Sequence, residues 1–286
     1  MTKLFTDTSA NLPVALLREY DIDVIPFSYT VNGVQAEYPE EADFDGKAFY
    51  DAMRGGAEVN TSMVNPALAA EHFEKALSQG MDVLYIGMSG GVSGTAQAAA
   101  LAASELREKY PAAQIGTIDT YAASLGEGLQ VLEAAELLRA GKPFQEVYDA
   151  ILARRPHMCQ FFTVDNLAYL KRTGRISGVV ALAGTVLGIK PILRGDETGH
   201  IVQCGTARGN KRAYAELAEY YGTRVLDKTA RIGIAHADNT EGVEYLMGLL
   251  REKGFAGECV TVYYEPVTGA HVGPGTVALF FYGTEK

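Results

Sequence analysis

Hydroxyl-bearing residues gather at a glycine-rich turn in the first third of the chain. The run Ser89-Gly90-Gly91-Val92-Ser93-Gly94-Thr95 leaves an apolar segment and enters an alanine-rich one over 96–110. Small residues let the backbone turn sharply, and Ser93 is placed to cap the following helix. Unpaired N–H groups at a helix start, aided by hydroxyls, can hold a carboxylate or a phosphate. The run matches neither a dinucleotide-binding motif nor a P-loop, and a capped glycine turn without a ligand is the alternative.

A second hydroxyl cluster precedes another expected helix. Asn65 and Pro66 have the types preferred at the N-cap and at the first helical position. Thr61 and Ser62 lie outside that cap, so they either form a local turn or reach a ligand. Similar hydroxyls follow two further expected strands, at 8–9 and at 120. We therefore expect polar side chains at the sheet edge where open α/β sheets bind ligands.

Two basic residues, His271 and Arg175, are further candidates for contact with a ligand. His271 is flanked by glycines and a proline over 269–275, and Arg175 follows a short expected helix. A lone histidine is more often a structural hydrogen-bonding group than a catalyst. A serine hydrolase built from Ser93 and His271 with Asp119 or Asp7 is conceivable, but the G-x-S-x-G motif is absent.

Composition and charge exclude several kinds of binding partner. A net charge of −10 over 286 residues argues against nucleic acid and anionic membrane surfaces. The cysteines at 159, 204 and 259 form no C-x-x-C pair, and no spacing of His, Cys, Asp or Glu indicates a metal site. The start of the chain lacks a signal-peptide pattern, and the longest apolar stretch, 179–189, is too short to span a bilayer. We expect a cytoplasmic protein without stable membrane insertion.

Short apolar runs alternate with longer amphipathic ones, which is typical of an α/β fold with mostly parallel sheets. Strands are expected at 3–7, 22–31, 83–87, 115–119, 159–164, 190–193, 231–235, 260–264 and 277–282. The dipeptide Asn32-Gly33 after the second of these indicates a hairpin turn. The segment 122–155 predicts two helices with a break at Gly141-Lys142-Pro143. A boundary near Arg155 to His157 divides the chain into an N-terminal α/β domain, 1–156, and a C-terminal one, 157–286.

Taken together, the motifs resemble those of the DegV family along the whole chain. The matching pieces are Asp7-Thr8-Ser9 with Asn11-Leu12-Pro13, Thr61-Ser62, Ser89 to Thr95 with Gln97, Asp119-Thr120 with Ala123-Ser124, Leu167 to Ser177, Gly188 to Pro191, and His271 to Gly275. Each piece is weak alone, but seven in the right order are specific. The sequence departs from the usual pattern at Met63-Val64-Asn65, at Thr173 and at Val272.

The resemblance implies two α/β domains with a long-chain fatty acid bound between or within them. By position, Thr61 and Ser93 would contact the carboxylate, with Ser62 and the N–H groups of Gly94 and Thr95 nearby. Arg175 and His271 would line the entrance or assist phosphoryl transfer. The protein would need no cofactor or metal and would itself perform no catalysis.

A separate ATP-binding fatty acid kinase subunit would phosphorylate the bound acid, and the acyl phosphate would feed phospholipid synthesis. Two alternatives remain at this point. One is a self-sufficient serine acyl hydrolase or acyltransferase, and the other is a sensor of a different amphipathic acid.

Overall fold

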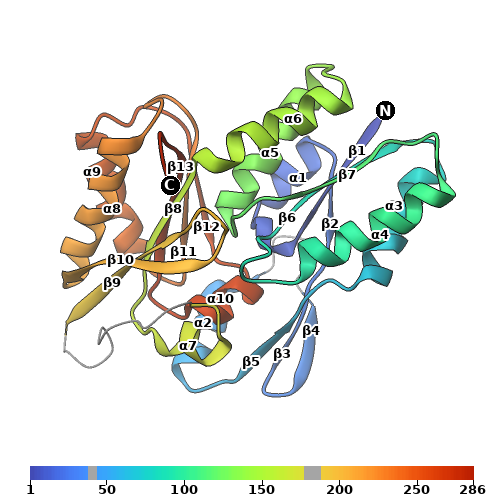
Figure 1. The fold of residues 1–286 in the computed structure, drawn as a ribbon. Coiled ribbons are helices and arrows are strands. Elements are labelled where there is room, and N and C mark those ends of the chain that lie inside the picture. The colour runs from blue at the N-terminus through green and yellow to red at the C-terminus, as the bar shows by residue number, and fades with distance from the viewer. Residues whose placement is uncertain (38–43, 177–187) are drawn as a thin grey trace.

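The computed structural model describes residues 1–37, 44–176 and 188–286 of the chain. Two sheets lie side by side with helix α5 (Leu125–Arg139) between them, and a small third sheet lies below the first (Figure 1). Ser177, the end of one sequence motif, and most of the apolar stretch 179–189 lie outside the described residues.

The first sheet is parallel and has the strand order β2-β1-β6-β7. Its strands are β1 (Thr2–Asp7), β2 (Ile22–Ile25), β6 (Asp82–Gly87) and β7 (Ile115–Asp119). The helices packed on it are α1 (Val14–Glu19), α3 (Pro66–Leu77), α4 (Thr95–Lys109), α5 and α6 (Phe144–Arg154). Because helices cover both faces, β6 is buried almost throughout and reads as a continuous apolar run.

The small sheet has the order β4-β3-β5 and was not expected from the sequence. Its strands are β3 (Ser28–Val31), β4 (Val34–Glu37) and β5 (Val59–Ser62), and α2 (Gly46–Arg54) follows β4. The expected single strand over 22–31 is wrong, because it breaks at Pro26, which has no N–H to donate to a ladder. Asn32 and Gly33 do form the expected hairpin turn, both with positive φ.

The second sheet has the order β10-β9-β8-β13-β11-β12. Its strands are β8 (Met158–Thr163), β9 (Ile189–Gly195), β10 (Ile201–Arg208), β11 (Ile232–His236), β12 (Cys259–Tyr263) and β13 (Val277–Tyr282). Helices α8 (Asn210–Arg224) and α9 (Thr240–Glu252) pack on its outer face (Figure 1).

The α/β class is confirmed, and the first sheet is parallel as expected, but the second sheet is mostly antiparallel. Within it β11 and β12 are parallel, whereas the other four neighbouring pairs are antiparallel. The reason lies in the connections: β9 and β10 are joined by a tight turn closed by hydrogen bonds between Asp196 and His200. A tight turn reverses the chain, whereas parallel neighbours need a long crossover. The domain boundary near 156 stays a prediction.

Helix α5 is buried on nearly all sides and contacts strands of both large sheets. Glycines allow this close packing. A Cβ on Gly128 would lie 2.4 Å from the backbone oxygen of Ala10, and one on Gly126 would lie 3.0 Å from Phe280 of β13. As a result, one continuous hydrophobic core joins residues of β1 to residues of β13.

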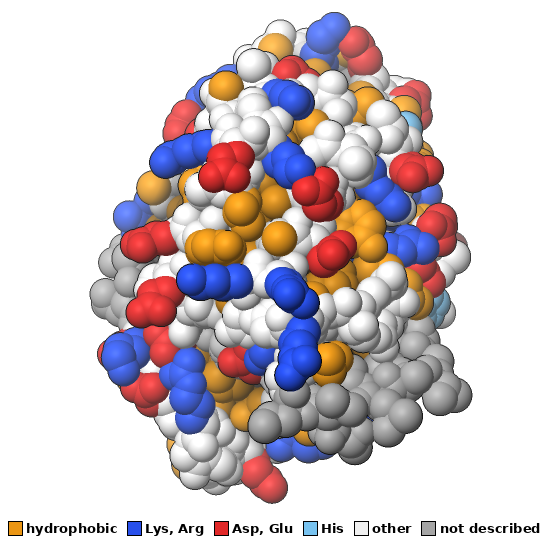
Figure 2. Space-filling model, turned by 90° about the vertical axis from the view of Figure 1, so that its left-hand side faces the viewer, with side chains coloured by type: hydrophobic (Ala, Val, Ile, Leu, Met, Phe, Trp, Pro, Cys, Tyr) orange, Lys and Arg blue, Asp and Glu red, His pale blue; other side chains and the backbone are white. Residues whose placement is uncertain are grey.

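Short helices complete the fold. They are η1 (Thr8–Ala10), η2 (Arg155–His157), α7 (Ala168–Thr173) and α10 (Pro266–Val272). On the face shown in Figure 2, basic and acidic side chains alternate with small hydrophobic areas rather than forming a field of one sign. No helix in the described part of the chain is long and apolar enough to cross a lipid bilayer.

Candidate functional site

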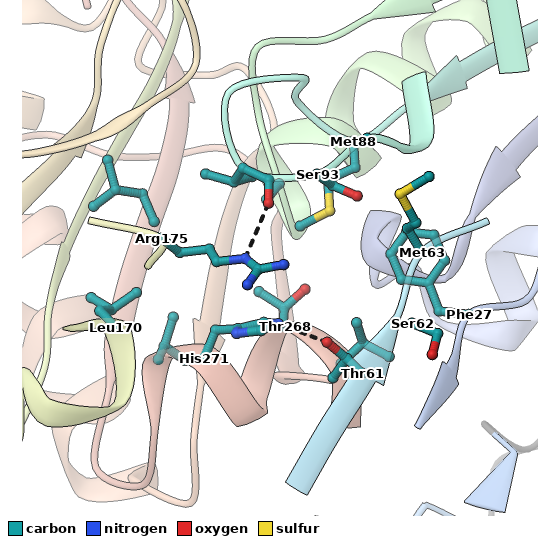
Figure 3. Close-up of a pocket in the computed structure, with 16 residues that line it drawn as sticks. Phe27, Thr61, Ser62, Met63, Met88, Ser93, Leu170, Arg175, Thr268 and His271 are labelled. Atoms are coloured by element: carbon teal, nitrogen blue, oxygen red, sulfur yellow. Dashed lines mark hydrogen bonds between the residues drawn. The ribbon is translucent and has the colours of Figure 1, made fainter. Parts of the chain in front are cut away.

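A cavity of about 400 Å³ lies where β5, the Ser89–Gly94 loop, α7 and α10 meet. Its walls come from segments far apart in sequence: Phe27, Thr61, Ser62, Met63, Met88, Val92, Ser93, Gly94, Ala123, Leu170, Arg175, Ile201, Val267, Thr268, His271 and Val272 (Figure 3). The fold therefore brings together six of the seven residues singled out in the sequence. Thr95, the seventh, is fully buried and does not line the cavity.

The Ser89–Gly94 loop is tightly folded onto itself. The N–H groups of Val92 and Ser93 both donate to the carbonyl of Ser89, at 3.2 and 3.1 Å. The N-cap of α4 is Gly94 rather than the expected Ser93. The Ser93 hydroxyl nevertheless faces the helix start, because it lies 2.9 Å from the Thr95 hydroxyl and accepts from the Thr95 N–H at 3.3 Å. Ser93 thus lines the cavity as part of a local hydroxyl turn.

Two close approaches explain the glycines of this loop. A Cβ on Gly91 would lie 2.6 Å from the backbone of Gly199, because the β9–β10 turn packs directly on the loop. The Ser89 hydroxyl donates to the Gly199 carbonyl at 2.9 Å and fixes this contact. A Cβ on Gly94 would lie 2.7 Å from the sulfur of Met63, which projects across the cavity from the end of β5. The loop is therefore held from both sides.

Thr61 and His271 are joined across the cavity wall. Thr61 lies on β5, paired with Tyr29 of β3, and its hydroxyl is 3.0 Å from Nε2 of His271 on α10 (Figure 3). Burial, together with the guanidinium charges of Arg175 and Arg172, lowers the pKa of His271 to about 4. The imidazole is therefore neutral near pH 7. Its Nδ1 has no hydrogen-bond partner among the described residues.

Arg175 places a permanent positive charge beside this neutral pair. It follows the Gly174 cap of α7, whose φ of 70° turns the chain back toward the cavity. Its Nε donates to the carbonyl of Val92 at 3.3 Å, and one terminal nitrogen donates to Thr173 at 2.5 Å. Because these acceptors are uncharged, the guanidinium charge remains available to an anion in the cavity. The site combines hydroxyls, a neutral imidazole and one cation.

A second, smaller cavity of about 50 Å³ continues from the first. The two share five lining residues, namely Val92, Ala123, Ile201, Thr268 and Val272. The remaining wall includes Phe162, Tyr264 and Phe280, which make it largely apolar. The combined space therefore has a polar end at Thr61 and Ser93 and an apolar end against the second sheet.

Buried carboxylates hold the elements around the cavity. Asp7, at the end of β1, accepts from the Tyr85 hydroxyl at 2.6 Å and from the Met88 N–H at 3.1 Å. Glu265 caps α10 by accepting from the N–H groups of Val267 and Thr268 at 2.5 and 2.6 Å. Burial raises the pKa of Glu265 to about 7 and also raises that of Asp7. Asp7 thereby positions Met88, which lines the cavity, and Glu265 positions α10.

A third buried carboxylate lies on α5. Glu127 accepts from the Thr6 hydroxyl at 2.9 Å and is also hydrogen-bonded to the Ser9 hydroxyl. Burial and the neighbouring charge of Asp7 raise the pKa of Glu127 well above its ordinary value. Sequence reasoning missed Glu127, since a glutamate inside a helix gives no sign of burial.

Other hydroxyls at strand ends are occupied within the protein. Thr8 accepts from the Phe27 N–H at 2.9 Å, and Thr120 donates to the Gly87 carbonyl at 2.8 Å. Asp119 accepts from the N–H groups of Gly90 and Tyr121 at 3.0 and 2.9 Å. These residues shape the loops and do not line the larger cavity.

No hydrogen bond among the described residues links Ser93, His271 and an aspartate into the catalytic triad considered from the sequence. Ser93 pairs with Thr95, whereas His271 pairs with Thr61. Asp7 and Asp119 are bonded to other groups, as described above. Among the described residues no group of three or more His, Cys, Asp or Glu side chains is placed to hold a metal ion.

Comparison with known proteins gives consistent matches over the full length. The model of the DegV family, described as an uncharacterised protein family, matches residues 1–284. A DegV domain-containing protein of Clostridium perfringens is 36% identical over 284 residues, which cover 99% of this chain and 98% of that protein. One from Lactococcus lactis is 32% identical over 278 residues, 97% of this chain and 96% of its own length.

Solved structures of similar proteins share the fold. A DegV family protein from Thermus thermophilus, described as binding fatty acid, has a TM-score of 0.87 and 31% identity, with 99% of both chains covered. A fatty acid binding DegV family protein from Streptococcus agalactiae has a TM-score of 0.86 and 28% identity, with 100% of this chain and 99% of that chain covered.

Proposed function

Because the chain belongs to the DegV family, we propose that it binds one long-chain fatty acid in the joined cavities and works as a carrier in the cytoplasm. The observation that carries the proposal is the polarity of this space. Thr61, Ser93 and Arg175 lie at one end, and Phe162 and Phe280 lie at the other. A carboxylate with a long apolar tail is the ligand that fits such an arrangement. The larger cavity, at about 400 Å³, is within the usual size range of ligand pockets.

The head group would be held mainly by uncharged donors. We infer that the carboxylate accepts from the hydroxyls of Thr61 and Ser93, with Ser62 and the N–H group of Gly94 nearby. The Thr95 N–H, expected to contribute as well, donates to the Ser93 hydroxyl instead. The partly buried neutral imidazole of His271 orients Thr61 through their 3.0 Å contact. Arg175 adds the charge that a buried carboxylate needs for compensation. Hydrogen bonds to a charged group contribute about 1.5 to 3 kcal/mol each.

The tail would supply most of the affinity. Burying one methylene contributes about 0.8 kcal/mol, so a 16-carbon tail contributes on the order of 12 kcal/mol before the entropy of association is subtracted. We therefore expect slow release and a ligand that survives purification.

The carrier would present its acid to a separate ATP-binding kinase subunit, which forms the acyl phosphate used in phospholipid synthesis. This step is proposed from the family resemblance together with the place of Arg175 and His271 beside the head-group end. Both side chains can stabilise charge that develops during phosphoryl transfer. The separate pairing of Ser93 and His271 favours this carrier over a stand-alone hydrolase.

The test begins with denaturing extraction and mass spectrometry of the purified protein. We expect a stoichiometric fatty acid of roughly 14 to 18 carbons, and a higher melting temperature when palmitate or oleate is added to delipidated protein. Absence of lipid together with an unchanged melting temperature would refute the proposal. Addition of a cognate ATP-binding subunit should yield acyl phosphate, and esterase activity of the protein alone that vanishes in Ser93→Ala would favour the hydrolase.

A further inference from the structure

Three carboxyl groups lie in the protein interior among uncharged partners. Asp7, Glu127 and Glu265 each have at most 1% of their surface exposed. The hydrogen bonds that they accept within the described part of the chain come from hydroxyl and backbone N–H groups. Burial and the nearby charge of Asp7 raise the pKa of Glu265 to about 7. Because buried carboxylates repel one another and lose hydration, such a cluster retains protons into the neutral range.

Glu265 lies directly behind the wall of the larger cavity. Its carboxylate accepts from the N–H groups of Val267 and Thr268 at 2.5 and 2.6 Å, and both of these residues line that cavity. Thr268 and His271 project from the same helix, α10, toward the cavity (Figure 3). By contrast, the hydroxyls bonded to Glu127 come from residues that line neither cavity. Glu265 is therefore the member of the cluster with the most direct connection to the head-group helix.

The other ionisable groups around Glu265 differ in whether they can change charge near neutral pH. On the elements packed around α10 they are His271 of the helix itself, Lys171, Arg172 and Arg175 of the α7 segment, Tyr29, Tyr50, Tyr264, Asp7 and Glu127. Strand β5 and helix η1, which also contact α10, carry none.

Most of these groups keep one charge state between about pH 6.5 and pH 8.5. The imidazole of His271 is neutral because its pKa is lowered to about 4. Burial raises the pKa values of Tyr29 and Tyr264, so both hydroxyls stay protonated. Tyr50 donates its hydroxyl proton to the Tyr264 carbonyl at 2.7 Å. The carboxyl cluster is thus the part of this surrounding that can exchange a proton with solvent, and Glu265 is its member at the cavity wall.

A fatty-acid head group brings a further negative charge to the other side of this wall. We propose that Glu265 takes up a proton from solvent when the fatty-acid carboxylate binds, so that α10 does not separate two negative charges. The proposal rests on the fatty-acid function proposed above. Two unit charges about 10 Å apart, at an effective dielectric constant of about 20, change an equilibrium constant roughly tenfold. Affinity is therefore highest where Glu265 is protonated before binding, and it falls as the pH rises through neutrality.

The experiment counts protons by isothermal titration calorimetry. Laurate, a more soluble fatty acid, is titrated into delipidated protein at pH 7.5 in buffers with different enthalpies of ionisation. The slope of the observed heat against that enthalpy gives the number of protons taken up. For wild type we expect roughly half a proton, and an affinity that falls about three- to tenfold between pH 6.5 and pH 8.5. Dodecanol has the same chain length and no charge, so it should bind without proton uptake.

Two variants assign the proton to its carboxyl group. Glu265→Gln should bind laurate without proton uptake, and its affinity should stay nearly constant between pH 6.5 and pH 8.5. The matched control is Glu127→Gln, because Glu127 is equally buried but its hydroxyl partners line neither cavity. This control should keep the uptake.

Several results would overturn the proposal while leaving the fatty-acid function in place. They are binding of laurate by wild type without proton uptake, equal uptake in Glu265→Gln, equal uptake with dodecanol, and a loss of uptake in Glu127→Gln alone. A loss of affinity in Glu265→Gln by the same factor at every pH would make Glu265 a structural cap only. Failure of wild type to bind laurate or palmitate at any pH would refute the fatty-acid function itself. The wild-type measurement needs no variant, so the test stands even if Glu265→Gln does not fold.

Discussion

Ionisation of Glu265 should make the protein less stable as the pH rises through neutrality. Burial raises the pKa of this carboxyl from 4.5 to about 7. A raised folded-state pKa means that the folded protein binds the proton more tightly than the unfolded chain does. The stability contributed by the protonated form is therefore complete below pH 4.5 and is lost as the pH rises to about 7. Each pKa unit corresponds to about 1.4 kcal/mol, so the free energy of unfolding should fall by about 2 to 3 kcal/mol between about pH 5 and pH 8.

The other acidic side chains determine the pH at which the free energy of unfolding is largest. Asp7 and Glu127 are also fully buried with raised pKa values, so they strengthen the decline with rising pH. Exposed Asp51 and Glu71 have pKa values lowered by hydrogen bonds to lysine, so their contribution is lost only as the pH falls. We expect maximal stability on the acidic side of neutrality.

The assay is urea unfolding of delipidated protein, followed by circular dichroism at several pH values. The side chain in Glu265→Gln is uncharged at every pH and keeps one oxygen to cap α10. Its free energy of unfolding should therefore lack the fall of about 2 to 3 kcal/mol that wild type shows between about pH 5 and pH 8. Glu252→Gln, at the exposed end of α9, is the control and should follow wild type. A wild-type protein at least as stable at alkaline as at acidic pH, or an equal slope in Glu265→Gln, would refute the reasoning.

Three further predictions concern the site and its supports. Ser93→Ala and Thr61→Ala should each weaken fatty-acid binding by about 1 to 3 kcal/mol in a fluorescence competition assay, and unchanged affinity in the double variant would reject this head-group site. Arg175→Ala and His271→Ala should reduce acyl phosphate formation with the kinase subunit more than lipid affinity, whereas equal losses would make them ligand-holding residues only. Asn65→Ala removes the cap of α3, in which Asn65 accepts an N–H at 2.9 Å, and it should lower stability by about 1 kcal/mol without changing lipid affinity.

Local patterns predicted the features that depend on neighbouring residues. The cap at Asn65, the turn at Asn32-Gly33 and the break between α5 and α6 each follow from the chemistry of a few adjacent positions. The family resemblance is confirmed over nearly the whole chain. Strand β5 was missed because the segment 59–62 is short and largely polar, and its place in a sheet depends on pairing with β3.

Pairing between distant segments was the part that local patterns could not predict. The antiparallel second sheet follows from strands that meet only after folding, such as β13 with β8. The placement of Thr61 against His271, from positions 210 residues apart, is likewise a property of the assembled core.

Helix α5 limits how the chain can be divided. Its Gly128 side meets η1 and its Gly126 side meets β13, so each half of the molecule completes the other's interior. We expect a single cooperative unfolding transition rather than two, and a fragment truncated after residue 156 should aggregate, because the surface that meets Phe280 would be exposed to water. Recombination of halves between relatives would succeed only where both sides of this helix remain matched.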